Sequence, residues 1–343
     1  MRIPIALLVL IGVVSIVGCG EDEEAATPTA PLGSPTSLAS PAASGTARPT
    51  GTVVPATPVG TAEAIPSGKI AFSSRRDGNG EIYLLSREGE QNISNGPTED
   101  MESSLSPDGK KIVFASDRDG TSRIYVVNVD GSGLVKLTSD AAGDLSPRWS
   151  PDGKQIAFSR TGSLYVMDSE GANVRQITEA ESEASAPPCK AGAFLGGWSP
   201  DGKRLTFYAA SATRGLGQIC TVGSDGSDLT VVASEPPTYH VEPSWSPDGE
   251  WIVYRFIDKG ASPTPEDDNH EIYIVKPDGA SRTNLTNHPA TDIEPSWSPD
   301  GKWIVFASDR TGGFDLYIMK PDGSDLKRLT TDPAKDSDPS WGP

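Results

Sequence analysis

Acidic side chains occur at two regular positions ahead of a tryptophan that the chain repeats. Counted back from that tryptophan, or from Leu105 in one copy, the fifth and the third residues are each acidic in four of six copies. Carboxylates at a fixed spacing in successive copies could gather around one site and bind a cation or a basic peptide. The acidic members, with the one histidine among them, are Asp100, Glu102, Asp144, His240, Glu242, Asp292, Glu294, Asp336 and Asp338.

The segment that carries these residues is expected to be a short strand. Side chains alternate along a strand, so the two acidic positions should share one face. If this strand is the innermost of each repeat, the carboxylates form an acidic ring around a channel mouth, interrupted where Ala193 and Leu195 stand. The same carboxylates could instead accept hydrogen bonds from backbone amides of neighbouring repeats and lock the repeats together. The sequence leaves both interpretations open.

The tryptophan belongs to the string Trp-Ser-Pro-Asp-Gly-Lys, which occurs at residues 149–154, 198–203 and 297–302. Residues 245–250 and 105–110 each differ from that string at one position. From Trp149 to Trp341 the copies are 44 to 52 residues apart, a period typical of repeat architectures. The Pro and the Asp-Gly pair predict a tight turn in which the Asp bonds to nearby backbone, so we expect this Asp to be structural.

One complete repeat, residues 292–330, predicts four short strands rich in β-branched and aromatic residues. Such a meander has the size of a propeller blade. The repeats begin at residue 68 with a second strand and finish at 338–341 with a first strand. We therefore expect an all-β fold, a six-bladed β-propeller of four-stranded blades over residues 66–343. The C-terminal strand should complete the N-terminal blade and close the ring.

The repeat also resembles a known family. Its pattern is a Pro before Trp-Ser-Pro-Asp-Gly-Lys, then Ile-x-Phe-x-Ser, Ile-Tyr, Asp-Gly and Leu-Thr. This pattern is similar to the WD40-like PD40 repeats of the TolB-type β-propeller family and covers about four-fifths of the chain. The resemblance implies a six-bladed propeller. The protein that gives the family its name carries an α/β domain before its propeller, and here a low-complexity segment takes that place.

The N-terminal segment predicts export. Residues 3–17 form an apolar run that is short for a membrane span, and small residues then precede Cys19. This arrangement resembles the lipobox of bacterial lipoproteins, which implies a signal peptide over 1–18 and a lipidated Cys19. An uncleaved signal anchor and an ordinary signal peptide are the alternatives. Residues 19–65 are rich in Pro, Thr and Ala and contain no aromatic residue, so we expect a disordered tether.

Composition and cysteine count narrow the function. The net charge of −18 argues against nucleic acid as a partner, because nucleic-acid binding needs a basic surface. If Cys19 is lipidated, Cys189 and Cys220 remain as a pair in a disulfide-permissive compartment. They form either a disulfide or two buried free thiols. No His, Cys and acidic spacing predicts a metal site, and no motif predicts a cofactor.

The longest insertions lie at residues 179–194, 209–217 and 258–270. In a propeller these connections all emerge on the face that carries the acidic ring, the usual location of a binding site on a repeat scaffold. We expect a monomeric, non-catalytic scaffold on the extracytoplasmic side of a bacterial membrane, in the periplasm or on the cell surface. It would bind an envelope protein or peptide through this acidic face. The alternative is a carbohydrate-active envelope enzyme, a lyase or glycosidase, that uses the channel with His240, Glu242 and Asp292.

Overall fold

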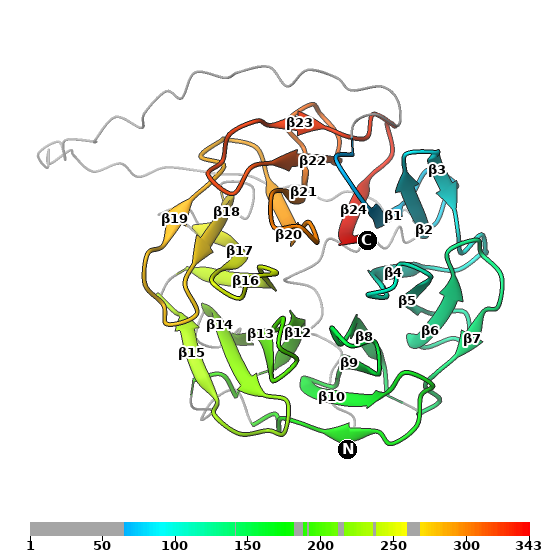
Figure 1. Cartoon of the computed structure of the whole chain (residues 1–343), viewed down its shortest axis with the longest axis horizontal. Coiled ribbons are helices and arrows are strands. Elements are labelled where there is room, and N and C mark those ends of the chain that lie inside the picture. Colours follow the sequence, from blue (N-terminus) through cyan, green and yellow to red (C-terminus); the bar gives the residue numbers. More distant parts are fainter. Residues whose placement is uncertain are drawn as a thin grey trace, which may run out of the picture. The chain divides into compact units, whose positions relative to one another are not determined.

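The computed structural model describes residues 65–140, 142–181, 188–190, 192–211, 216–235, 238–258 and 268–343. These residues form strands and turns arranged as a ring around a central opening (Figure 1). The fold is an all-β propeller. The signal peptide, Cys19 and most of the tether lie outside the described residues, as do parts of the three long insertions.

The strands form antiparallel meanders, which we number by their order along the chain. The first meander contains β24 (Asp336–Gly342), β1 (Lys69–Ser74), β2 (Glu81–Ser86) and β3 (Gly89–Asn92). The second contains β4 (Asp100–Leu105), β5 (Lys111–Ser116), β6 (Arg123–Asn128) and β7 (Val135–Lys136). The third contains β8 (Asp144–Trp149), β9 (Gln155–Arg160), β10 (Ser163–Asp168) and β11 (Arg175–Gln176).

The remaining three meanders follow the same plan. The fourth contains β12 (Ala193–Trp198), β13 (Arg204–Ser211), β14 (Leu216–Gly223) and β15 (Thr230–Ala233). The fifth contains β16 (Tyr239–Trp245), β17 (Ile252–Asp258), β18 (Asn269–Val275) and β19 (Thr283–Asn284). The sixth contains β20 (Asp292–Trp297), β21 (Ile304–Ser308), β22 (Asp315–Met319) and β23 (Lys327–Arg328).

Two features of the sheet topology bear on the predicted architecture. The last strand, β24, pairs antiparallel with the first, β1, as the terminal fragments predict. Four sheets have four strands each, but the fourth and fifth meanders share one eight-stranded sheet. A single parallel pair, Gly217 with Tyr239, joins β14 to β16. A Cβ at Gly217 would lie 3.1 Å from the carbonyl oxygen of His240, so glycine permits this close approach.

The hydrophobic core lies between neighbouring meanders. Six clusters of buried side chains among the described residues are each shared by two consecutive meanders, including the sixth and the first. The innermost strands also contact one another in a closed cycle, from β4 through β8, β12, β16 and β20 to β24 and back to β4. The residues next to the central opening therefore come from all the meanders.

The repeated turn confirms the structural role expected for its Asp. In residues 298–303, the Ser298 hydroxyl donates to Asp300 (2.8 Å), and the backbone N–H of Lys302 donates to the same carboxylate (3.2 Å). Gly301 has a φ of 68°, which glycine adopts without steric cost. The same Ser–Asp bond occurs in the other four copies, so each Asp fixes its own turn.

The propeller begins at least one residue before the expected boundary at 66. Ile65 is 2% exposed and packs in the cluster between the sixth and first meanders. Trp341 donates its indole N–H to the carbonyl of Ser67 (2.9 Å), and Arg87 donates to that of Pro66 (2.8 Å). Among the described residues, no helix is long and apolar enough to span a bilayer.

Candidate functional site

A bulge in the innermost strands separates the two acidic positions that were expected to share a face. The pairing of β4 with β5 shifts register between Met101 and Ser104, and Glu102 inside the shift has a φ of 54°. The same shift occurs in all six innermost strands, and Ser146, Glu242, Glu294 and Asp338 also have positive φ. Because the bulge interrupts the alternation, the prediction of a single ring is wrong. The nine residues form two sets.

The fifth residues before the tryptophan form a buried set that is neutralised within each meander. Asp100, Asp144, Asp292 and Asp336 are all 0% exposed. Each accepts hydrogen bonds from an arginine of its own meander: Asp100 from Arg118 (3.0 Å), Asp144 from Arg160 (2.5 Å), Asp292 from Arg310 (2.8 Å) and Asp336 from Arg76 (3.2 Å). These four carboxylates hold their own meander together.

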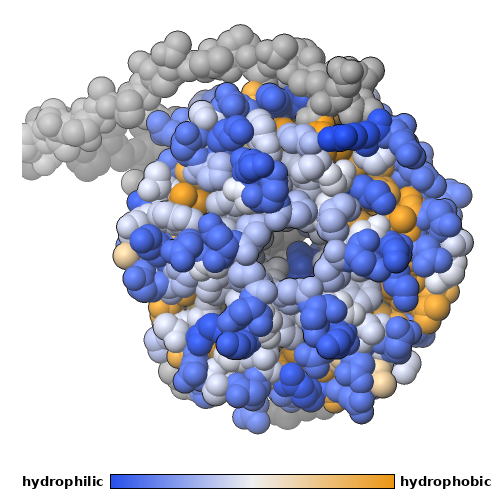
Figure 2. Space-filling model, in the orientation of Figure 1, coloured by the Kyte–Doolittle hydropathy of each residue, from blue (hydrophilic) through white to orange (hydrophobic). Residues whose placement is uncertain are grey.

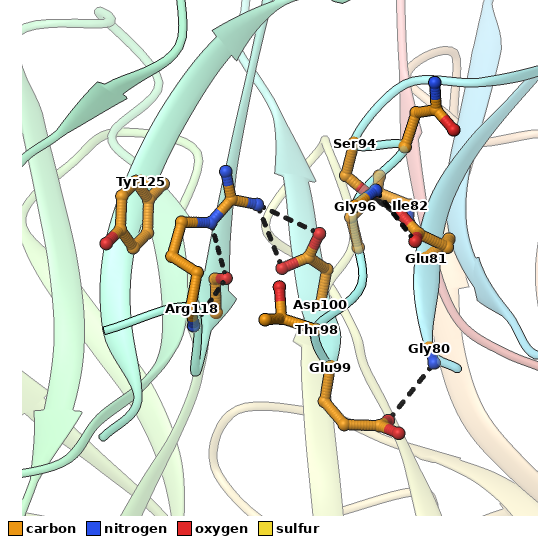
Figure 3. Close-up of polar contacts among 12 residues, drawn as sticks. Gly80, Glu81, Ile82, Ser94, Gly96, Thr98, Glu99, Asp100, Arg118 and Tyr125 are labelled. Atoms are coloured by element: carbon orange, nitrogen blue, oxygen red, sulfur yellow. Dashed lines mark hydrogen bonds and ion pairs between the residues drawn. The ribbon is translucent and has the colours of Figure 1, made fainter. Parts of the chain in front are cut away.

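Each of these arginines also packs on two aromatic rings. In the second meander the Arg118 guanidinium lies 5.5 Å from the centre of Phe114 and 4.7 Å from that of Tyr125. Its Nε donates to Ser116 (2.8 Å). Figure 3 shows the guanidinium of Arg118 directed at Asp100 with Tyr125 beside it. We call this unit of Asp, Arg, Phe and Tyr the lock.

The sequence reasoning missed the arginines of the lock. A signal was present, because Arg76, Arg118, Arg160 and Arg310 occur in the four repeats that have Asp at the fifth position. The fourth repeat has Ala193 there and the fifth has His240.

The third residues before the tryptophan form a second, inward set. Each of three carboxylates accepts the backbone N–H of the matching residue in the next meander: Glu102 from Ser146 (2.6 Å), Glu242 from Glu294 (2.9 Å) and Glu294 from Asp338 (2.6 Å). Glu102, Glu242, Glu294 and Asp338 are partly exposed, and we call them the channel carboxylates. Figure 2 shows the opening at the centre of the ring.

The charge of these carboxylates is only partly compensated. Glu242 pairs with Arg255 at 2.7 Å, whereas within the described residues Glu102, Glu294 and Asp338 form no ion pair. Surrounding protein and the neighbouring Asp338 and Glu242 raise the pKa of Glu294 to about 8. Burial likewise raises the pKa of Glu102 and of Asp338. The raised pKa values indicate that negative charge at these positions is poorly stabilised by the protein alone.

Arg148 is a cation among the channel carboxylates. Its Nε donates to the carbonyl of Gly196 (3.1 Å) in the fourth meander, and its Nη1 donates to the carbonyl of Glu102 (3.3 Å) in the second. Burial lowers the pKa of Arg148, while Glu102 and Asp338 act in the opposite direction. The guanidinium therefore links three successive meanders through backbone carbonyls.

The fifth meander replaces the lock with a different aromatic arrangement. His240 is 0% exposed, and its ring centre lies 5.4 Å from that of Tyr254 and 5.2 Å from that of Phe256. Burial, with a contribution from Arg282, lowers the pKa of His240 to about 4. His240 therefore packs as a neutral ring and is not beside the channel carboxylates. Asp292, the third residue expected to act with His240 and Glu242, lies in the lock of the sixth meander.

A mixed polar cluster stands near Glu242 instead. Arg255 donates to Glu242 from one side and contacts Nδ1 of His270 at 2.8 Å from the other. Burial, with contributions from Glu242 and Glu102, raises the pKa of Tyr208 well above its ordinary value. Tyr208 stacks on Phe194 with ring centres 4.9 Å apart. In the described part of the chain, no three His, Cys, Asp or Glu side chains lie close enough to hold a metal ion.

The two cysteines lie in the fourth meander. Cys189 and Cys220 form a disulfide that closes 31 residues of chain, with Cα atoms 5.9 Å apart. Cys220 is in β14, and Cys189 belongs to the connection that enters β12. The disulfide therefore fixes part of one of the long insertions to the sheet.

Known proteins resemble this chain over its propeller. Uncharacterized protein Atu1656 of Agrobacterium fabrum is 31% identical over 169 residues, which are 49% of this chain and 51% of that protein. The TolB homolog of Chlorobium chlorochromatii is 28% identical over 179 residues, which are 51% of this chain and 36% of that protein. The matches thus span about half or less of these curated relatives.

The structural comparison agrees with the sequence comparison. The crystal structure of TolB from Acinetobacter baumannii has a TM-score of 0.66 and 21% identity, over 81% of this chain and 67% of that one. At that identity the likeness shows the fold. The PD40 profile, described as the TolB beta propeller domain, matches residues 64–189, 144–264 and 259–343, which together exceed half of the chain. This protein belongs to the TolB β-propeller family.

Proposed function

We propose that this protein is an extracytoplasmic scaffold, tethered to a bacterial membrane by lipid on Cys19, that binds a protein or peptide at the channel of a closed six-bladed propeller. The cycle of innermost strands and the six shared clusters support six blades, with the fourth and fifth meanders as separate blades in one sheet. The apolar run and the lipobox-like residues before Cys19 support the location, and the propeller belongs to the TolB family. The disordered tether would run up to residue 64.

The observation that carries this proposal is the set of channel carboxylates. Glu102, Glu294 and Asp338 lack an ion-pair partner among the described residues, and they hold backbone conformations that non-glycine residues rarely adopt. Strained backbone tends to persist where function requires it. A basic segment of a partner would supply the missing positive charge.

The test removes the ability of these side chains to carry negative charge and keeps the hydrogen bonds. The triple variant Glu102→Gln, Glu294→Gln and Asp338→Asn can still accept the backbone N–H bonds that Glu102 and Glu294 accept in the native protein. The full-length protein in detergent, immobilised, is exposed to envelope extract beside the variant, and retained proteins are identified. We expect a partner that the native protein retains and the variant loses. Equal retention by two equally folded proteins would refute binding through the channel carboxylates.

A second candidate is a carbohydrate-active enzyme, and one observation favours it. Arg255 donates to Glu242 and contacts Nδ1 of His270. Guanidinium, imidazole and carboxylate groups together could perform acid–base chemistry on a sugar. The native protein would be assayed for release of reducing or unsaturated ends from acidic polysaccharides. Activity that is present in the native protein and absent in Arg255→Lys would support this candidate. Activity that survives this substitution would exclude the cluster as its source.

A further inference from the structure

The outermost strands leave one edge of each sheet unpaired. Within the described residues, β3, β7, β11, β15, β19 and β23 each pair with one strand of their own meander and with no other. An unpaired edge presents backbone N–H and C=O groups that an extended chain can bind. Proteins usually protect such edges with charged or other polar side chains.

Five of these six strands carry that protection. Their charged or amide side chains are Glu90, Gln91, Asn92, Lys136, Arg175, Gln176, Asn284, Lys327 and Arg328. The exception is β15, whose four residues are Thr, Val, Val and Ala. Val231 in this strand is 39% exposed, and Leu229 just before it is 37% exposed. β15 therefore carries no charged or amide side chain along its edge.

The edge of β15 is also held in place. Cys220 lies opposite Val231 in the pairing of β14 with β15, and the disulfide joins Cys220 to Cys189. Gln218 accepts the backbone N–H of Cys189 (3.1 Å) and donates to Ser234 (2.7 Å). A strand fixed in this way needs little reorganisation to accept a partner, which lowers the cost of binding.

Acidic residues flank β15 at both ends. Asp225 and Asp228 precede the strand and are exposed, and Glu235 follows it with a side chain that is 66% exposed. Arg282 pairs with Glu235, so the charge at that end is partly compensated. Arg204 donates to the backbone carbonyl of Asp228 (2.6 Å), so an arginine stands at each end of β15. Within the described residues, Asp225 and Asp228 form no ion pair, and the end before the strand is therefore complementary to a basic residue of an extended, otherwise apolar segment.

We propose that β15 is a strand-addition site for an extended segment of a protein partner. The segment would contain three or four β-branched residues flanked by lysine or arginine. Its backbone pairs with the free edge of β15, its side chains contact Leu229 and Val231, and one basic end approaches Asp225 and Asp228. This site lies on the outer rim of the ring (Figure 1), on an outermost strand and separate from the channel carboxylates.

The test uses a defined peptide in place of the partner. A fluorescent peptide, acetyl-Lys-Val-Thr-Val-Thr-Lys-amide, is titrated with the full-length protein in detergent. A second peptide, acetyl-Lys-Val-Thr-Pro-Thr-Lys-amide, replaces the second Val by Pro, which keeps both charges but removes a backbone donor. We expect the first peptide to bind at least tenfold more tightly and to slow hydrogen exchange at residues 229–234. Equal affinity for the two peptides, or no binding of the first at millimolar concentration, would overturn the proposal.

Two matched variants locate the site. Val231→Lys introduces into β15 the residue type that β7 and β23 already carry, and Val135→Lys makes the same change on β7, where the side chain is 52% exposed. We expect Val231→Lys to weaken binding of the first peptide at least tenfold and Val135→Lys to change it less than twofold. Equal effects would show that only added charge matters. Thermal unfolding of both variants checks that each is folded.

Discussion

The fourth and fifth meanders differ from the other four in how their interiors are held together. The first, second, third and sixth meanders each bury an Asp–Arg lock over a Phe and a Tyr. The fourth and fifth lack the lock, share one sheet and carry the longest insertions. They contain the disulfide, the buried His240 and the cluster around Arg255 instead.

The same repeat is therefore stabilised in two ways. In the four meanders that have the lock, a buried Asp–Arg ion pair stabilises the meander, and its loops are short. Where the lock is absent, covalent and aromatic contacts stabilise the meander, and new polar groups stand beside the central opening. Binding residues occur disproportionately on loops that a rigid scaffold positions, so the long insertions of the fourth and fifth meanders favour a binding surface there.

Breaking a lock should have the largest effect on stability. In Asp100→Ala the Arg118 guanidinium, mostly buried, loses its partner, and loss of one member of a buried ion pair typically costs about 3–5 kcal/mol. Urea unfolding followed by tryptophan fluorescence measures the loss. Asp108→Ala, in an exposed turn of the same meander, is the control and should cost far less. A loss below about 1 kcal/mol for Asp100→Ala would mean that the lock is not what holds this meander.

Removing the disulfide should have the next largest effect. The double variant Cys189→Ser and Cys220→Ser opens a 31-residue loop, which should lower the free energy of unfolding by about 3–4 kcal/mol. The same urea titration is the measurement, and the native protein under reducing conditions is the comparison. If the double variant is as stable as the native protein, the fourth meander does not depend on the cross-link that replaces its lock.

Acid should destabilise the fifth meander through His240. The pKa of His240 is about 4 in the folded protein and near 6.5 when unfolded, so below pH 6.5 the unfolded state binds the extra proton. The stability contributed by neutral His240 is present above pH 6.5 and falls between pH 6.5 and 4, by roughly 3 kcal/mol in total. Melting temperatures across this range measure the fall. In His240→Phe, which keeps a ring against Tyr254 and Phe256, the slope between pH 6.5 and 4 should be reduced; an unchanged slope would assign it to other groups.

Adding a side chain at Gly196 should be harmful in the fourth meander. The residue two before the tryptophan is Pro in four repeats and Gly196 in the fourth. A Cβ at Gly196 would lie 2.1 Å from the carbonyl oxygen of Pro243, so Gly196→Ala should cost about 1–3 kcal/mol through overpacking. Gly197→Ala, whose Cβ would meet nothing within 4 Å, is the neighbouring control. Equal melting temperatures for these two variants would contradict the close approach of β12 to β16.

Much of the fold could be predicted from the sequence because the same pattern of strands and turns recurs in several repeats. The pairing of β24 with β1 was predictable from the terminal fragments, since each lacks what the other supplies. The joining of the fourth and fifth meanders into one sheet could not be predicted. It depends on the approach of Gly217 to Tyr239 in space, and a glycine in a strand does not indicate which backbone segment packs against it.

The candidate site was predictable in its residues but not in its geometry. Strict alternation put Asp100 and Glu102 on one face, whereas a bulge with positive φ at Glu102 sends them to different environments. A glutamate at such a position gives no local signal, because glycine or asparagine is the usual choice. The pairing of Asp100 with Arg118 could have been inferred from their shared presence across repeats, which requires comparison between repeats and not along one strand.

The pairing of β24 with β1 has a consequence for how the protein folds. Ser74 lies opposite Asp336, so one sheet joins residues more than 260 positions apart. Contacts of such long sequence separation slow folding, because the entropy of closing the chain is lost before the contacts form. The first meander keeps a free inner edge until residues 336–342 have been synthesised. The ring therefore closes only after residues 336–342 have left the ribosome.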